Sequence, residues 1–199
     1  MATGSAKQPI KLIVALGNPG REHQSDRHNV GFRWLDQLCD REQSSLKAES
    51  KFYSKLAKLN LSGQSVFCMA PQTFMNASGR AVSAVAKFYK IDPAEILVVY
   101  DELDLPTGAA RLKFSGGHGG HNGVRDIAKA LSSKDFWRLR IGIGHPGSAR
   151  DVSDYVLSSA SVSDAQKIQI AVDDSFRVLA NLIAGESDQA MLDLHTEIK

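Results

Sequence analysis

Two short apolar runs constrain the fold of this chain most, because each one stops abruptly at polar residues. Residues 11–17 (KLIVALG) are followed by Asn18-Pro19-Gly20, and residues 96–100 (ILVVY) are followed by Asp101. Apolar runs of this length that end at turn-forming or polar residues are typical of strands buried inside a sheet. We therefore expect two interior strands, each with polar side chains directly after its carboxyl end.

The rest of the pattern alternates between strands and helices. Helical spacing of apolar residues predicts helices over 29–42, 77–89, 123–131 and 165–183, with a short acidic helix at the end of the chain. Further strands are predicted over 52–60, 65–70, 109–114 (an edge strand) and 137–144. This alternation predicts an α/β fold around a largely parallel or mixed sheet. In such sheets, functional sites form beyond the carboxyl ends of the strands.

Length and composition predict one domain with no membrane segment. The chain has 199 residues, and we expect a single domain over residues 10–199 after a flexible N-terminal segment, residues 1–9. No apolar run approaches the ~18 residues of a membrane span, and no signal-peptide core is present, so the cytoplasm is the expected location. Cys39 and Cys68 lie in different segments without a CxxC pattern, which predicts buried free thiols.

Charge is distributed unevenly along the chain. Residues 107–150 carry 8 Lys/Arg and 2 Asp/Glu, whereas residues 151–199 carry 3 and 9. A basic segment of this kind indicates an anionic partner. Two solvated faces of opposite sign that partly neutralise each other would account for the same numbers.

The glycine-rich stretch GGHGGHNG at residues 116–123 suits neither a helix nor a strand. One interpretation is a metal loop, in which His118 and His121 bind an ion together with His28 or His145. A second is a loop that opens a helix, with Asn122 as the cap. The third, which we favour, is a loop whose backbone lies against a substrate.

Five polar residues fall in predicted loops, and several of these loops follow strands: His28, Asp101, Asn18, Asn76 and Asn122. Each one has an ordinary structural explanation as a turn or capping residue. Together they suit catalysis, because a carboxylate that orients an imidazole is the minimum for general-base chemistry. Neutral amides hold polar substrates without adding charge and donate to a developing oxyanion.

Several long and irregular motifs occur in an order that resembles the bacterial type of peptidyl-tRNA hydrolase, which is also found in organelles. The resemblance runs from about Lys11 to at least Leu182. The motifs that carry it are LIVALGNPG (12–20), RHNVGF (27–32), PQTFMNASG (71–79), DELDLPTG (101–108), GGHGGHNG (116–123) and RLRIGIGHPG (138–147). It implies a single α/β domain with a twisted mixed sheet flanked by helices on both faces.

The activity implied by this resemblance is hydrolysis of the ester bond that joins a peptide to the 3′ end of tRNA, which recycles stalled peptidyl-tRNA. On the family pattern, His28 activates the water and Asp101 orients and polarises His28. Asn18 contacts the peptide and distinguishes peptidyl-tRNA from free aminoacyl-tRNA. Asn76 and Asn122 hold the peptide and the terminal adenosine.

The resemblance also assigns residues around this centre. Phe74 packs against the substrate, His121 assists from beside the glycine loop, and Lys113 with Arg140 grips the 5′-phosphate of tRNA. No metal and no organic cofactor are implied. The implied partner is peptidyl-tRNA, there is no membrane partner, and the protein is expected to be a monomer.

Two residues depart from the family pattern. His23 stands where the family usually has a tyrosine that binds substrate, so an imidazole takes that position here. Asp26 replaces a small hydroxyl residue and brings a negative charge close to His28, which favours the protonated base. The main alternative function is that of organellar relatives that bind RNA in splicing without hydrolysis as their role, and the basic segment 107–150 fits either function.

Overall fold

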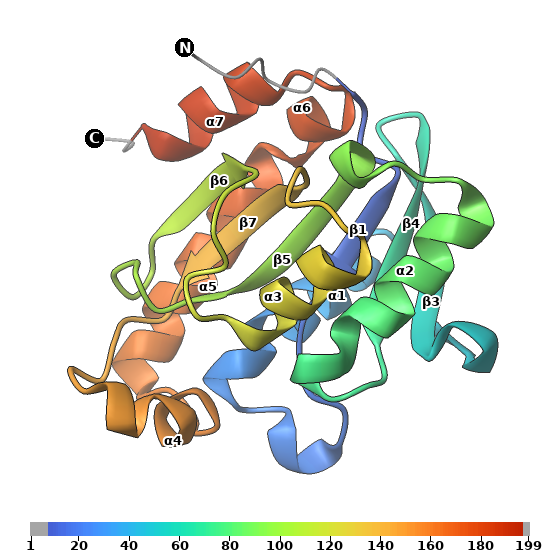
Figure 1. Cartoon of the computed structure of the whole chain (residues 1–199). Coiled ribbons are helices and arrows are strands. Elements are labelled where there is room, and N and C mark those ends of the chain that lie inside the picture. Colours follow the sequence, from blue (N-terminus) through green and yellow to red (C-terminus); the bar gives the residue numbers. More distant parts are fainter. Residues whose placement is uncertain (1–7, 197–199) are drawn as a thin grey trace.

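The computed structural model describes residues 8–196, so most of the expected flexible segment 1–9 lies outside the described residues. Its core is a seven-stranded sheet between helices (Figure 1). The strands are β1 (Leu12–Ala15), β2 (Lys47–Glu49), β3 (Ser54–Leu61), β4 (Gln64–Pro71), β5 (Ile96–Glu102), β6 (Ala110–Phe114) and β7 (Trp137–Gly142). The helices are α1 (Val30–Arg41), α2 (Ser78–Tyr89), α3 (Asn122–Ala130), α4 (Val152–Val156), α5 (Val162–Arg177), α6 (Leu179–Ile183) and α7 (Ser187–His195).

The sheet is mixed, as the sequence predicts. Its strand order is β2-β3-β4-β1-β5-β7-β6. The four central strands β4, β1, β5 and β7 run parallel, whereas β3 pairs antiparallel with β4, and β6 pairs antiparallel with β7. The predicted edge position of 109–114 is confirmed, because β6 is the last strand of the sheet.

Helices cover both faces of the sheet (Figure 1). Alternating side chains of the buried strands divide the core into two clusters. Ile13 and Val99 belong to the cluster with α1, α5 and α6, whereas Val14 and Val98 belong to the cluster with α2 and α3. Helix α7 lies along β6, where the His195 ring accepts a hydrogen bond from the Leu112 backbone N–H at 3.0 Å. The predicted mixed sheet with helices on both faces is therefore confirmed.

The prediction of one long helix over 165–183 is wrong in one respect, because the helix is interrupted at Val178, between α5 and α6. Apolar residues keep a spacing of three or four across the break, so the spacing alone does not reveal it. The sequence pattern gives no signal for β2 and α4, which have three and five residues. Elements this short carry too few residues for a periodic pattern.

One glycine brings the start of α1 against the sheet. A Cβ at Gly31 would lie 2.5 Å from the Leu16 carbonyl oxygen and 2.6 Å from the Val99 carbonyl oxygen. Only glycine permits so close an approach of two backbones. The close packing holds the preceding single-turn 3-10 helix η2 (Arg27–Asn29) beside the ends of β1 and β5.

Two further expectations are tested by the fold. Cys39 and Cys68 are both buried and free, as predicted. No helix among residues 8–196 is long and apolar enough to cross a membrane.

Candidate functional site

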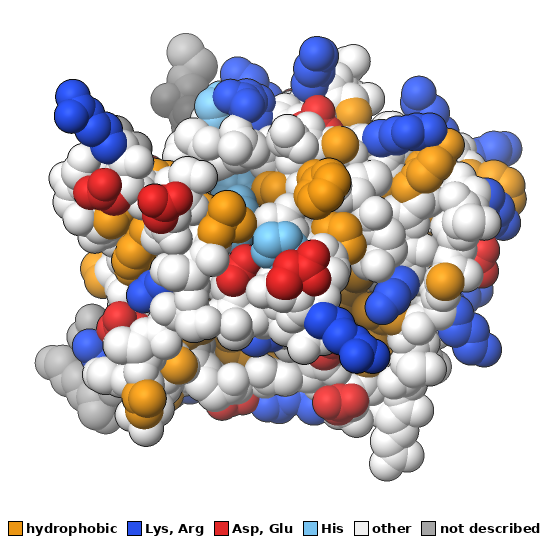
Figure 2. Space-filling model, turned by 90° about the horizontal axis from the view of Figure 1, so that it is seen from below, with side chains coloured by type: hydrophobic (Ala, Val, Ile, Leu, Met, Phe, Trp, Pro, Cys, Tyr) orange, Lys and Arg blue, Asp and Glu red, His pale blue; other side chains and the backbone are white. Residues whose placement is uncertain are grey.

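A cavity of about 580 Å³ lies at the carboxyl end of the parallel strands. Figure 2 looks onto this end of the molecule, where histidine and acidic side chains lie near the centre of the face. The loop after β1, the end of β5, the start of α3 and helix α4 all contribute to the wall. The lining side chains used below are Asn18, His28, Asn76, Asp101, His121 and Asn122.

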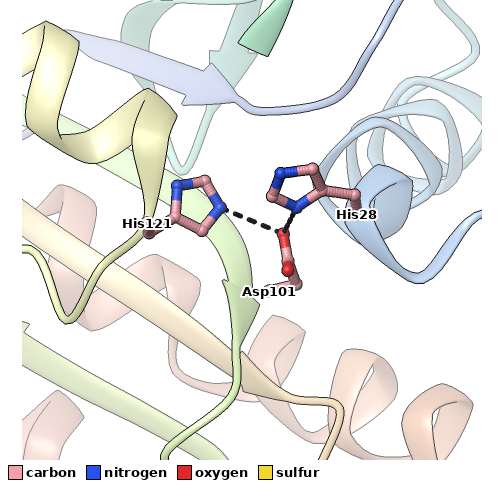
Figure 3. Close-up of side chains that lie close together, drawn as sticks. All are labelled: His28, Asp101 and His121. Atoms are coloured by element: carbon pink, nitrogen blue, oxygen red, sulfur yellow. Dashed lines mark hydrogen bonds and ion pairs between the residues drawn. The ribbon is translucent and has the colours of Figure 1, made fainter. Parts of the chain in front are cut away.

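Two histidines converge on one carboxylate oxygen in this cavity (Figure 3). Nδ1 of His28, from η2, lies 2.8 Å from Oδ1 of Asp101 at the end of β5. Nε2 of His121, which precedes α3, lies 3.1 Å from the same oxygen. The two ring centroids are 4.9 Å apart. The sequence predicts the pairing of His28 with Asp101, and the structure brings these two residues together.

The hydrogen bonds fix which nitrogen of each histidine carries a proton. Nδ1 of His121 accepts from the Val124 backbone N–H at 3.3 Å, so its Nε2–H must be the donor to Asp101. The Asp101 carboxylate accepts from Nδ1–H of His28 as well. Nε2 of His28 has no partner within residues 8–196 and keeps a free lone pair, which is what a general base requires.

The electrostatics of the site favour a basic His28 beside an ionised Asp101. Burial of the His28 ring lowers its pKa, but attraction to Asp101, with a smaller contribution from Asp26, raises the pKa above its ordinary value. Burial raises the pKa of Asp101, yet His28 and His121 together hold it well below its usual range. Asp101 therefore stays charged throughout the pH range in which His28 titrates.

Asn18 is held rigidly by its neighbours. Its backbone N–H donates to Oδ1 of Asn29 at 2.8 Å, and Nδ2 of Asn29 donates back to the Asn18 carbonyl oxygen at 2.9 Å. Oδ1 of Asn18 accepts from the Met75 backbone N–H at 2.9 Å. Its Nδ2 therefore remains available as a donor to a bound ligand. Sequence reasoning missed Asn29, although its position in RHN directly beside His28 was a usable signal.

Asn76 and Asn122 lie on the cavity wall and are exposed. The alternative interpretation of Asn122 as the cap of α3 is wrong. The N-cap of α3 is His121, and Asn122 is the first helical residue. Asn76 lies in the single turn η4 (Met75–Ala77), and α2 has no side-chain cap. The neighbouring Phe74 is 67% exposed on the same loop and does not line the cavity.

The two residues that depart from the family pattern contact each other. Nδ1 of His23 lies 2.8 Å from Oδ2 of Asp26, and Asp26 is almost completely buried. His23 lies outside the lining of the cavity. The expected effect of Asp26 on His28 is confirmed in direction, because Asp26 contributes to the raised pKa of that ring.

Lys113 and Arg140 lie on the same face of neighbouring strands. Lys113 on β6 is opposite Arg138 on β7, so Arg140 is its diagonal neighbour. Nε of Arg140 donates to the buried Glu102 carboxylate at 2.8 Å, which orients the guanidinium. Arg138 is buried and donates to the carbonyl oxygens of Gly116 and Gly117, so it holds the glycine loop in place.

Arg27, the residue next to His28, contacts the end of helix α4. Its Nη1 lies 2.8–3.3 Å from four oxygens of residues 155–159, and its guanidinium lies 4.1 Å from the centre of the Tyr155 ring. Arg27 is 8% exposed. Because α4 forms part of the cavity wall, this contact sets the distance between that wall and His28. Arg27 is a site residue that the sequence pattern does not single out.

The interpretation of the glycine-rich stretch as a metal loop is only partly matched by the structure. Among residues 8–196, one cluster has three potential metal ligands with ligand atoms within 4.8 Å of one another, namely His28, Asp101 and His121. His118 is outside this cluster, and its Nδ1 accepts from the Gly120 backbone N–H. The two ring nitrogens that face Asp101 both act as hydrogen-bond donors in this arrangement.

Comparison with known proteins gives one consistent result. A family model described as peptidyl-tRNA hydrolase matches residues 12–199. A curated peptidyl-tRNA hydrolase of Methylobacillus flagellatus is 53% identical over 190 residues, which cover 96% of this chain and 98% of the relative. One from Marinomonas sp. is 47% identical and covers 94% and 97%. The crystal structure of peptidyl-tRNA hydrolase from Acinetobacter baumannii has a TM-score of 0.91 at 42% identity, covering 97% of both chains.

Proposed function

The chain belongs to the peptidyl-tRNA hydrolase family and hydrolyses the ester bond of peptidyl-tRNA, and we propose that His28 is the general base of this reaction, with Asp101 as its charged partner. The observation that supports this most is the free Nε2 of His28, whose opposite nitrogen is fixed by Asp101 at 2.8 Å. A base must be oriented and unprotonated on its reactive side before it takes a proton.

In the proposed reaction, Nε2 of His28 takes a proton from a water molecule while the water oxygen adds to the ester carbonyl carbon. The imidazolium that forms is stabilised by the ionised Asp101. When the tetrahedral intermediate collapses, the bond to the 3′-oxygen of tRNA breaks and that oxygen receives the proton from His28. The products are a peptide with a free carboxylate and an intact tRNA.

The amides of the cavity bind the substrate without adding charge. Nδ2 of Asn18 is the donor for a peptide carbonyl, and Asn76 and Asn122 hold the peptide and the terminal adenosine. Phe74 contacts the substrate from the rim, and His121 keeps Asp101 oriented. His23 contacts the substrate outside the cavity lining, where its Nδ1 is hydrogen-bonded to Asp26.

The tRNA body is proposed to reach the β6–β7 edge, where Lys113 and Arg140 bind the 5′-phosphate. Glu102 accepts from Nε of Arg140 and so orients the guanidinium, a planar group suited to phosphate binding. No metal or cofactor takes part in this scheme. The proposed setting is the cytoplasm and the proposed working unit is the monomer, because all of these residues come from one chain.

The deciding experiment is cleavage of N-acetyl-aminoacyl-tRNA compared with free aminoacyl-tRNA. We expect ester cleavage of the blocked substrate and strong preference for it. Asn18→Asp should relax this preference, because a carboxylate attracts the free ammonium while its oxygen still accepts from Met75. Tight tRNA binding without cleavage would instead favour the alternative of an RNA-binding protein.

A further inference from the structure

A second cavity of about 660 Å³ adjoins the first and is not used by the reaction described above. Asn18 lines both cavities, so the two share a wall. The second cavity lies beside the ends of β1, β4 and β3, whereas the first lies beside β5 and the loop after β7. The sheet order therefore places the second cavity on the flank opposite to the proposed phosphate site on β6 and β7.

The second cavity is polar and carries more positive than negative charge. Its lining includes three cations, Arg21, Arg33 and Lys55, and one carboxylate, Asp36. Attraction to Lys55 opposes the upward effect of burial on the pKa of Asp36, so these two side chains partly neutralise each other. The remaining excess charge belongs to Arg21 and Arg33.

Arg33 is the cation that the protein holds in place. Its Nη1 donates to the Gln24 carbonyl oxygen at 3.1 Å and to the Asp26 carbonyl oxygen at 2.7 Å. Nε and Nη2 have no hydrogen-bond partner in the described part of the chain, so the outer edge of the guanidinium is free. A fixed guanidinium with a free edge is suited to bidentate binding of a carboxylate.

We propose that this second cavity binds the peptide part of the substrate beyond its ester-linked residue, and that Arg33 binds an acidic side chain there; this rests on the proposed function. A peptide that leaves the catalytic centre past Asn18 enters this cavity next. The tRNA leaves on the opposite flank, toward Lys113 and Arg140. Peptides with Asp or Glu at the second or third residue from the ester are therefore the preferred substrates.

The test uses N-acetylated tripeptidyl-tRNAs that share one tRNA and differ at one residue, which is Asp, Asn or Lys at the second or third position from the ester. We expect kcat/KM for Asp to exceed that for Asn by about two- to fivefold at one of these positions, with Lys below Asn. The preference should weaken in 0.5 M salt, because the cavity is open to solvent and salt screens exposed charges.

Substitutions in helix α1 identify the side chain that causes the preference for Asp. Arg33→Gln should bring the Asp-to-Asn ratio close to one, and Arg33→Glu should invert it in favour of Lys. Arg41→Gln is the matched control, since Arg41 is on the same helix, pairs with Asp173 and lines neither cavity. It should keep the wild-type ratio.

The outcomes separate this inference from the proposed function. Failure to cleave N-acetyl-alanyl-tRNA, which has no second residue, would overturn the proposed function. If N-acetyl-alanyl-tRNA is cleaved but the tripeptidyl-tRNAs show an Asp-to-Asn ratio of one at both positions, only the acidic-peptide site is overturned. If Arg33→Gln lowers kcat/KM equally for every substrate, Arg33 serves the tRNA, and the inference is wrong.

Discussion

Replacing Asp101 with asparagine tests how the site controls its base. In the native site, one oxygen, Oδ1, accepts from both His28 and His121. His121 must donate from Nε2, because its Nδ1 already accepts from Val124. An asparagine at 101 must therefore present its carbonyl oxygen to both rings. The variant should keep the protonation pattern of His28 and lose only the negative charge.

The expected rate loss follows from that charge alone. A hydrogen bond to a charged group contributes about 1.5–3 kcal/mol, and one between neutral groups about 0.5–1.5 kcal/mol. The difference of about 1–1.5 kcal/mol corresponds to roughly a tenfold loss in kcat. Coulomb attraction over 2.8 Å at an effective dielectric of 20 sets a ceiling of about 6 kcal/mol. We expect a loss of about 10- to 100-fold, well below the ~10⁴-fold seen when an amide imposes the wrong tautomer.

The pH profile supplies the second measurement. The folded protein raises the pKa of His28 above 6.5, so kcat/KM of the native enzyme should rise with pH through a midpoint above 6.5. In Asp101→Asn the midpoint should move down, because the main cause of the upward shift is gone. The contribution of the His28–Asp101 pair to folding stability has the opposite dependence on pH. It is complete below pH 6.5 and is lost as the pH rises through the folded pKa of His28.

The assay is single-turnover cleavage of N-acetyl-aminoacyl-tRNA from pH 5 to 9. The double variant Asp101→Asn, His121→Phe removes the group that fixes the amide, so the amide is free to turn and the rate should fall further. A single Asp101→Asn variant that is already as slow as the double variant, with an unchanged midpoint, would refute this reasoning.

Four shorter predictions test other parts of the site. His28→Ala should lower kcat by about 10²–10⁴-fold with tRNA affinity unchanged in a filter-binding assay. Arg27→Lys should lower the melting temperature by about 4–10 °C, because charged hydrogen bonds are lost, and the same variant should reduce kcat/KM about tenfold as α4 shifts. Lys113→Ala or Arg140→Ala should raise KM for whole tRNA substrates without changing kcat, and each should reduce the salt slope of binding by about one. Treatment with a chelator should leave activity unchanged, and recovery of a chelated, inactive sample by zinc would contradict this.

The sequence predicts the fold well where the pattern is long or strongly apolar. The interior strands β1 and β5 are recognisable because nearly every residue is apolar and each run stops at a polar residue. The break at Val178 is not recognisable, since the apolar faces of α5 and α6 continue in phase. Tertiary packing determines where such a helix is interrupted, and the spacing of apolar residues carries no information about that position.

The candidate site shows a similar division. His28, Asp101 and the three asparagines are polar residues at predicted strand ends or loops, where their types already suggest chemistry. Arg27 and Arg138 gave no such signal, because an arginine in a motif or a strand is usually a surface residue. Their importance comes from backbone oxygens contributed by distant segments, the end of α4 and the glycine loop. A single sequence does not reveal those partners.

The placement of charge explains why this site uses amides around its base. A cation beside His28 would lower the pKa of the ring and weaken it as a base, whereas Asp101 and Asp26 raise that pKa. The substrate is anionic at its phosphates and needs cations for binding. Lys113 and Arg140 lie on one flank of the sheet and Arg33 lies on the other, while the guanidinium of Arg27, the residue next to His28, is directed to oxygens at the end of α4. In the proposed scheme, the neutral asparagines of this cavity bind the substrate without weakening the base that must act on it.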